Sequence, residues 1–260
     1  MLEWIRPLWA ETMANCEWKV CVLLAGSWRG ATSILLSSRG HHIIIDTGLP
    51  HEAHQLVSAL ERNRLKPSDI KTVINTHLHV DHVLNNALFS QAAIYATQES
   101  YDWCLSLYAD LADESHWETV ALKYYPEALQ RQDARNNVGS LRKFVLRWWD
   151  VKRLGEPGQF RWMERQPLPD GLESLITSGH VPGHASIIVH GETPTVVAAD
   201  ALLSREHDER VLTMIPHNAV QYQRDRMRIL ACGGHIIPGH DVGFLALEKA
   251  ESRNPIPSNT

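Results

Sequence analysis

The stretch Thr76-His77-Leu78-His79-Val80-Asp81-His82 places three histidines and one aspartate close together in the chain. It directly follows the apolar run 71–75, which is typical of a buried β-strand. Neutral imidazole and carboxylate groups are good ligands for zinc, manganese and iron. One His-x-His pair has low specificity, because histidines are common on surfaces, but His-x-His-x-Asp-His at a strand end is much more specific. The stretch therefore predicts a metal site at the end of this strand.

Composition restricts the class of protein. A chain of 260 residues with 44% hydrophobic residues can build one sizeable core, so residues 1–260 are predicted to form a single domain. A net charge of −5 provides no basic field for non-specific nucleic-acid binding. The N-terminal segment does not have the pattern of a secretion signal, and no run of about 18 apolar residues suggests a membrane span. Four scattered cysteines without a Cys-x-x-Cys pair favour buried thiols in a reducing, cytoplasmic compartment.

Apolar runs and helical spacings alternate along the chain. Strands are predicted at 19–24, 33–36, 42–46, 71–75, 92–95, 160–163, 175–177, 185–189, 195–199 and 235–238. Helices are predicted at 51–65, 81–88, 219–231 and 244–252, and the proline-containing tail 253–260 is predicted to fray. The segment 99–149 is rich in Leu, Ala, Glu and Arg, which indicates a helical insertion of two or three helices.

Further candidate ligands lie at three other strand ends. They are Ser178-Gly-His-Val-Pro-Gly-His184 before one strand, Asp200 at the end of the next, and Gly239-His240 after a third. Each of these alone is more often a turn former or a helix cap. Together with the stretch 76–82 they form the kind of ligand set with which a β-rich scaffold assembles a binuclear metal centre.

This ordered set resembles the metallo-β-lactamase superfamily, over residues 19–98 and 160–246. The resemblance implies an α/β fold, a four-layer αββα sandwich of two mixed β-sheets with helices on both outer faces. The turn Asp46-Thr47-Gly48 also matches a superfamily signature, in which the aspartate supports the ligands. The resemblance further implies seven metal ligands: His77, His79 and His184 for one metal, Asp81, His82 and His240 for the second, and Asp200 bridging both.

The segment 178–184 contains two candidate histidines. It is similar to a doublet in lactonase-like and glyoxalase II-like members, where the second histidine is the ligand. We therefore predict that His184 binds metal and that His180 supports the ligands or the loop. The other histidines, His217 among them, are assigned to solvent or to local hydrogen bonds.

The predicted chemistry is hydrolysis. A water held between two divalent metal ions has its pKa lowered toward ~7, so hydroxide is available at neutral pH to attack a carbonyl carbon or a phosphorus. Zinc is the expected metal, with manganese and iron as alternatives, because these ligands suit all three. Asp81 is predicted to handle protons as a catalytic residue as well as to bind metal. The chain has no Gly-x-Ser-x-Gly nucleophile elbow, and no organic cofactor is expected.

Two substrate classes stay open. The first is the ester-type carbonyl of a small molecule, because Thr76 to Asn86 and Gly239-His240-Asp241 resemble N-acyl-homoserine lactonases. Many of those lactonases carry a tyrosine where this chain has Leu203, so the resemblance does not identify a lactone as the substrate. The second is a phosphodiester, because Asp81-His82-x-x-Asn85 and the run 196–200 resemble a small RNA-processing branch of the superfamily.

The tryptophans of segment 99–149 and the basic residues at its C-terminal end are relevant to both substrate classes. Its tryptophans are predicted to pack against the sandwich, to cap the active-site face with an apolar pocket, or to form a homodimer contact. Basic residues at its end would suit RNA phosphates, although a solvated helix face is the simpler explanation. A non-hydrolytic metal-binding or redox module is the third alternative, disfavoured because the chain has no room for a flavin domain. The tryptophans are Trp103, Trp117, Trp148 and Trp149, and the basic residues are Arg142, Lys143, Arg147, Lys152 and Arg153.

Overall fold

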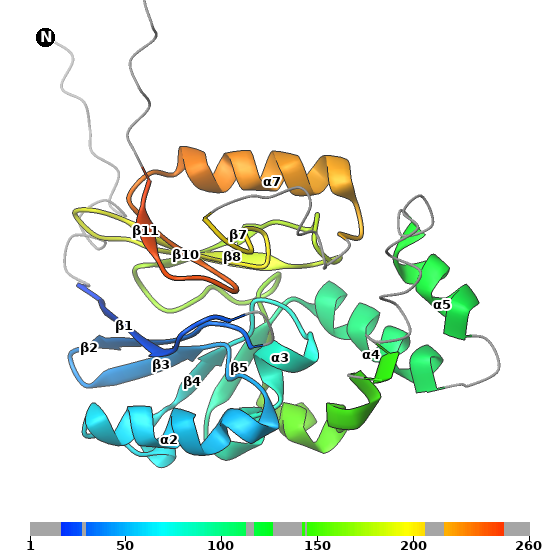
Figure 1. Ribbon diagram of the computed structural model, residues 1–260. Helices are drawn as coiled ribbons and strands as arrows, with labels where there is room; N and C mark the ends of the chain where they lie inside the picture. The colour runs from blue at the N-terminus through cyan, green and yellow to red at the C-terminus, as the bar shows by residue number, and fades with distance from the viewer. Residues whose placement is uncertain are drawn as a thin grey trace, which may run out of the picture.

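The computed structural model describes residues 17–27, 30–112, 117–126, 142–143, 145–205 and 216–246. Two β-sheets lie face to face, with helices on their outer sides (Figure 1). In spatial order the first sheet contains β1 (Lys19–Leu24), β2 (Ser33–Ser38), β3 (His41–Ile45), β4 (Thr72–Ile74), β5 (Ala93–Ala96) and β6 (Phe160–Trp162). The second contains β11 (Phe244–Leu245), β10 (His235–Pro238), β9 (Thr195–Ala199), β8 (Ala185–Val189) and β7 (Leu172–Ile176).

Both sheets are mixed. In the first, β1, β2 and β3 pair antiparallel, and β3, β4, β5 and β6 continue in parallel. In the second, β9 and β10 pair in parallel and the other pairs are antiparallel. The parallel strands bring several carboxyl ends to one edge of the sandwich, which is where the candidate ligands follow in the chain.

The helices cover the two outer faces. Helix α2 lies over the first sheet and α7 over the second, while α3, α4 and α5 lie toward one end of the sandwich (Figure 1). Among the described residues, no helix combines the length and apolar character that a membrane crossing requires. The α-helices are α2 (Ala53–Arg62), α3 (Val80–Val83), α4 (Gln98–Ala112), α5 (Trp117–Tyr124) and α7 (Ala219–Ala231). Short 3-10 helices are η1 (Pro50–Glu52), η2 (Pro67–Asp69), η3 (Asn86–Phe89), η5 (Val151–Leu154) and η6 (Pro157–Gln159).

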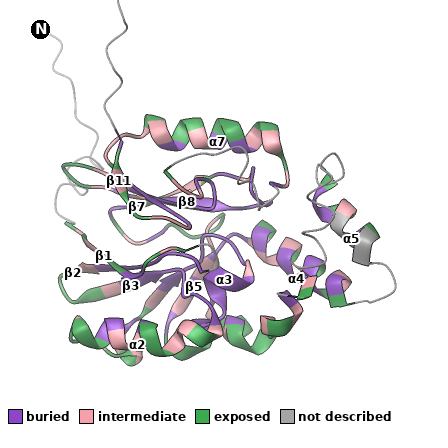
Figure 2. Cartoon of the chain, viewed as in Figure 1, coloured by how far each residue is buried: buried purple, intermediate pink, exposed green. Residues whose placement is uncertain are grey.

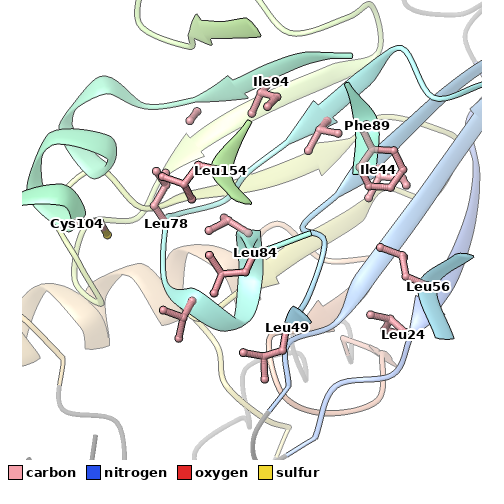
Figure 3. Close-up of a cluster of buried hydrophobic side chains, with 14 of the residues drawn as sticks. Leu24, Ile44, Leu49, Leu56, Leu78, Leu84, Phe89, Ile94, Cys104 and Leu154 are labelled. Atoms are coloured by element: carbon pink, nitrogen blue, oxygen red, sulfur yellow. The ribbon is translucent and has the colours of Figure 1, made fainter. Parts of the chain in front are cut away.

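The core has three apolar layers because side chains alternate along the strands. In β2, Ile34 and Leu36 pack between the two sheets, whereas Leu35 packs under the helices of the first sheet. Figure 2 shows the buried strands between exposed outer helix faces, and Figure 3 shows part of the layer beneath α2, with Ile44 and Leu56. The third layer, which includes Val196, Ala198, Ile229 and Ile236, lies between the second sheet and α7. These layers confirm the predicted αββα sandwich.

Most predicted elements are confirmed, and three differ. The strand predicted at 175–177 begins three residues earlier, because β7 runs from Leu172 to Ile176 and pairs with β8 over that length. The prediction of a helix over 81–88 is wrong in extent, because α3 ends at Val83 and only the short η3 follows. The prediction of a helix from Phe244 is wrong at its start, because Phe244 and Leu245 pair with β10 as β11. Pairing with a neighbouring strand has overridden the local helical pattern there. The rest of that predicted helix beyond 246, and the tail 253–260, lie outside the described residues.

Candidate metal centre

The candidate ligands follow strands of both sheets. Asp46 comes directly after β3, the stretch 76–82 follows β4, Asp200 follows β9, and His240 follows β10. Asp46 has a φ of 56° and Ala199 a φ of 45°, so the chain enters the left-handed region at two of these strand ends. Such a conformation is unfavourable for these residue types, and it is often retained where it aims a functional side chain.

The first ligand group gathers three imidazoles and one carboxylate. The Nδ1 atom of His79 lies 3.1 Å from the Nε2 atom of His77 and 3.1 Å from the Nε2 atom of His180. The His180 Nε2 atom lies 3.3 Å from Oδ2 of Asp200. The four ligand atoms lie within 4.8 Å of one another, which is close enough to surround one metal ion. His77 and Asp200 are fully buried.

The second ligand group comprises Asp81, His82 and His240, whose ligand atoms also lie within 4.8 Å of one another. The Nε2 atom of His240 lies 3.5 Å from Oδ2 of Asp81. Asp81 and His240 retain a little solvent exposure, with side chains about a tenth exposed, whereas His82 is fully buried. Each group therefore contains a partly exposed histidine, His79 in the first and His240 in the second.

Asp200 lies between the two groups. Its Oδ2 atom faces His77 and His180, and its Oδ1 atom lies 3.2 Å from His82 Nε2 and 3.3 Å from His240 Nε2. A carboxylate that directs one oxygen to each group has the geometry needed to bridge two metal ions. The bridging role that the superfamily resemblance implied for Asp200 stays a prediction.

Hydrogen bonds from residues behind the ligands orient the rings. Asp46 accepts bonds from the Thr76 backbone N–H at 2.9 Å and the Thr76 hydroxyl at 2.7 Å, and its Oδ2 atom also binds His82 Nδ1 at 2.7 Å. Likewise, His240 Nδ1 donates to the carbonyl of Ser27 at 2.7 Å. Each of these contacts turns the Nε2 atom of the ring toward the centre, as is usual for metal-binding histidines.

The structure brings His180 closer to the first ligand group than His184. Six of the seven predicted ligands lie in the two groups, but the fourth member of the first group is His180 and not His184. His184 is fully buried, its Nδ1 atom is 2.8 Å from the Thr177 hydroxyl, and its Nε2 atom has no hydrogen-bond partner. Its ring centroid lies 4.9 Å from that of His77. The ligand role of His184 therefore stays a prediction, with His180 the nearer imidazole.

Two glycines allow close approaches at the centre. A Cβ atom on Gly239 would collide with Oδ1 of Asp200, and one on Gly179 would collide with the backbone of Tyr222 in α7. The backbone N–H of Gly179 donates to the buried carboxylate of Asp225 in α7 at 2.9 Å. The loop that carries His180 is thus fixed against α7.

Burial and charge give the two groups different protonation states. Burial lowers the pKa of His79 to about 4 and that of His184 to about 3, and it lowers the pKa values of His77 and His180 well below 6.5. Burial also opposes the charged form of His240, but the carboxylates of Asp200 and Asp81 outweigh it and raise the pKa of His240 to about 9. Asp200 and Asp46 likewise raise the pKa of His82 well above 6.5, against burial.

Several buried polar atoms at the centre have no hydrogen-bond partner among the described residues. Leaving one such atom unsatisfied costs about 1–3 kcal/mol, so a cluster of them indicates a missing ligand. Five imidazole and carboxylate atoms that converge there form a donor set suited to divalent metal ions. They are Nε2 of His82, His184 and His240 and both carboxylate oxygens of Asp200.

Three further residues reach the centre: Trp103 and Tyr125 of the helical segment, and His217. A cap by the tryptophans of this segment was one of the predicted alternatives, whereas the contacts of Tyr125 and His217 were not predicted from the sequence. The ring of Trp103 in α4 lies 6.2 Å from that of His79, and the Tyr125 hydroxyl lies 3.1 Å from His79 Nε2. The backbone N–H of His217 donates to the carbonyl of His180 at 2.9 Å. No local pattern marks Tyr125 or His217, because both meet the ligands only through long-range packing.

Comparison with known proteins identifies the family. Residues 26–240 match the family model of the metallo-β-lactamase superfamily. The chain belongs to this superfamily. Its fold and its His/Asp cluster are those of a metal-dependent hydrolase.

Similar proteins in this superfamily include curated relatives and solved structures. Human metallo-β-lactamase domain-containing protein 1 is 27% identical over 223 residues, which cover 85% of this chain and 66% of the human protein. The N-acyl homoserine lactonase of Bacillus cereus is 24% identical over 200 residues, covering 67% of this chain and 65% of the lactonase. The chain thus spans about two thirds of the length of these relatives. AidC, a dizinc quorum-quenching lactonase, shares the fold with a TM-score of 0.57 and 16% identity, over 95% of this chain and 96% of AidC.

Proposed function

We propose that this protein is a binuclear metallohydrolase that opens the ester-type carbonyl of a small molecule, such as a lactone, an ester or a thioester. The observation that carries the proposal is Asp200, whose two carboxylate oxygens face two separate ligand groups. The proposed ligands are the seven of the superfamily pattern, and zinc is the proposed metal, with manganese and iron as alternatives. Two such ions supply hydroxide at neutral pH and polarise the carbonyl.

The side chains around the centre are suited to hold these ions and to move a proton. The low pKa of His79 keeps its ring neutral at pH 7, the form that offers a lone pair to a metal. Asp81 is the more exposed of the two carboxylates of the centre. We propose that Asp81 exchanges protons with solvent while Asp200 stays ionised between the groups.

The substrate class is supported by the relatives and by the aromatic side chains beside the centre. Two similar proteins are described as lactonases that act on N-acyl homoserine lactones or carry a dizinc site. Trp103 is half-buried beside His79 and also packs edge-on against Tyr124, Tyr125 and His217. An apolar surface of this kind suits the acyl part of an ester-type substrate.

A hydrolysis panel on one preparation tests the proposal. The panel contains N-acyl homoserine lactones of different chain length, acyl thioesters, simple aryl esters and short RNAs. Turnover of a lactone, ester or thioester with inert RNA is the expected result, and the Asp200→Asn variant measures any contaminating activity. RNA cleavage with inert carbonyl substrates would reject the proposed substrate class.

Phosphodiester hydrolysis is the second candidate, and one observation favours it. Lys143, Arg147, Lys152 and Arg153 are exposed on the end of the helical segment and could contact phosphates. Arg147 also lies 5.0 Å from the Trp148 ring, which explains its position without RNA. We therefore rank a small-molecule substrate first and nucleic acid second.

The free cysteines and the helical segment bear on the cellular compartment and the oligomeric state of the protein. Cys21, Cys104 and Cys232 are free thiols, and burial raises the pKa of Cys104 to about 12, as suits a structural thiol in a reducing cytoplasm. We propose a cytoplasmic enzyme, with a homodimer contact through the helical segment as an alternative to a substrate cap. Sedimentation of the purified protein at several concentrations distinguishes a monomer from a dimer.

A further inference from the structure

Tyr125 connects the helical segment to the metal centre. It directly follows α5, its side chain is buried, and its hydroxyl lies 3.1 Å from the Nε2 atom of His79. The hydroxyl therefore contacts the one ring nitrogen of His79 that does not face the other imidazoles.

The two nitrogens of His79 have different surroundings. Nδ1 lies 3.1 Å from the Nε2 atoms of both His77 and His180, so Nδ1 is the atom that faces the first metal position. A neutral imidazole carries one proton, and when Nδ1 offers its lone pair that proton must be on Nε2. Nε2–H then donates to the Tyr125 hydroxyl oxygen. The contact with Tyr125 thereby selects both the ring orientation and the tautomer that metal binding needs.

Tyr125 is itself held in place from several sides. Its ring packs edge-on against Trp103 at 5.6 Å between centroids. The carbonyl of the preceding residue, Tyr124, accepts a hydrogen bond from His217 Nδ1 at 2.7 Å, and the His217 backbone N–H donates to His180. Burial raises the pKa of Tyr125 well above 10, so its hydroxyl stays neutral. The contacts form a closed path from His79 through Tyr125 and His217 to His180 and back.

We propose that Tyr125 is a positioning residue of the metal centre, which fixes His79 with Nδ1 toward the metal and so makes metal affinity depend on the helical segment. This inference rests on the proposed metal centre. Partners of metal-binding histidines typically change metal affinity by about 10–100-fold when removed. The chain offers a neighbouring control, because the Tyr124 hydroxyl bonds the partly exposed carboxylate of Asp110 at 2.6 Å and not a ligand.

The test compares Tyr125→Phe with Tyr124→Phe in the full chain. Zn²⁺ affinity is measured by competition with a chromophoric chelator, together with the number of ions bound per chain. We expect Tyr125→Phe to weaken the tighter Zn²⁺ site by about tenfold or more, and Tyr124→Phe to stay within about twofold of the wild type. Equal affinities for Tyr125→Phe and the wild type would overturn the inference. If the wild type itself binds no Zn²⁺, the proposed metal centre is rejected, and not only the role of Tyr125.

A second measurement uses the wild-type protein, so its result does not depend on whether a variant folds. Nitrogen NMR of the Zn²⁺-loaded wild type reports which nitrogen of the His79 ring carries the proton. We expect the proton on Nε2, with Nδ1 bound to the metal. A proton on Nδ1 would overturn the inference even if Zn²⁺ is bound with full stoichiometry.

Discussion

The two ligand groups contain similar side chains, yet the surroundings of their imidazoles differ. In the first group, burial dominates and keeps His77, His79 and His180 neutral. In the second, carboxylates dominate, and Asp200 together with Asp46 or Asp81 holds His82 and His240 in the protonated form. If both groups bind metal as we propose, the first group offers neutral imidazoles, whereas His82 and His240 would have to release protons first.

The difference has a structural origin. The carboxylates of Asp46 and Asp81 lie on the side of His82 and His240, whereas apolar and aromatic residues such as Trp103 lie on the side of His79. Asp200 is shared by both halves. A substitution of Asp200 should therefore weaken the binding of both metal ions, whereas a substitution of a residue that belongs to one ligand group should weaken the binding of one ion.

The largest effect is expected for Asp200→Asn. Asparagine keeps the shape of the side chain but removes the charge that bridges the groups and that holds His82 and His240 protonated. We predict fewer than one ion per chain and a loss of hydrolysis well beyond the roughly 100-fold upper range for supporting residues. Elemental analysis and initial rates measure both. Glu173→Gln, which alters an exposed pair with His190, is the control and should retain metal and activity. Two tightly bound ions in Asp200→Asn would show that this carboxylate does not bridge.

The next largest effect separates His184 from His180. The Nε2 atom of His184 is buried and unpaired, which is costly unless a metal binds it, whereas that of His180 already has Asp200 nearby. We predict that His184→Ala loses the first metal and that His180→Ala keeps it, with an affinity reduced by about tenfold, the lower range for a supporting residue. Metal content after dialysis distinguishes them. The reverse pattern would make His180 the ligand and His184 the supporting residue.

The third prediction concerns the pH dependence of metal binding by the two groups, which needs no substitution. His240 has a pKa raised to about 9, so it is protonated at pH 7 and must release its proton to bind metal. His79 has a pKa of about 4 and is already neutral. Affinity for the second metal should rise up to about pH 9, by roughly tenfold per pH unit for each proton released. Affinity for the first should be nearly constant above pH 6. Zn²⁺ titrations at pH 6, 7 and 8 measure this, and parallel slopes for both metals would remove the proposed contrast.

The sequence predicted the part of the centre that strand ends determine. The candidate ligands of the stretch 76–82, with Asp200 and His240, follow apolar runs whose strands are confirmed, and the sandwich places those strand ends together. The position of His180 was not predictable, because it depends on Gly179 and Asp225 packing against α7. The same holds for Tyr125, which meets His79 across 46 positions of the chain. Local patterns report strands and turns, whereas such contacts depend on tertiary packing.

We propose a two-metal centre built around one shared carboxylate, that of Asp200. The most direct measurement is a Zn²⁺ titration of the metal-free wild type, with bound metal determined by equilibrium dialysis and elemental analysis at each step. We predict two ions per chain, with the second ion binding at higher Zn²⁺ concentration and hydrolysis appearing as it binds. Saturation at one ion per chain, or no tight binding at all, would contradict it.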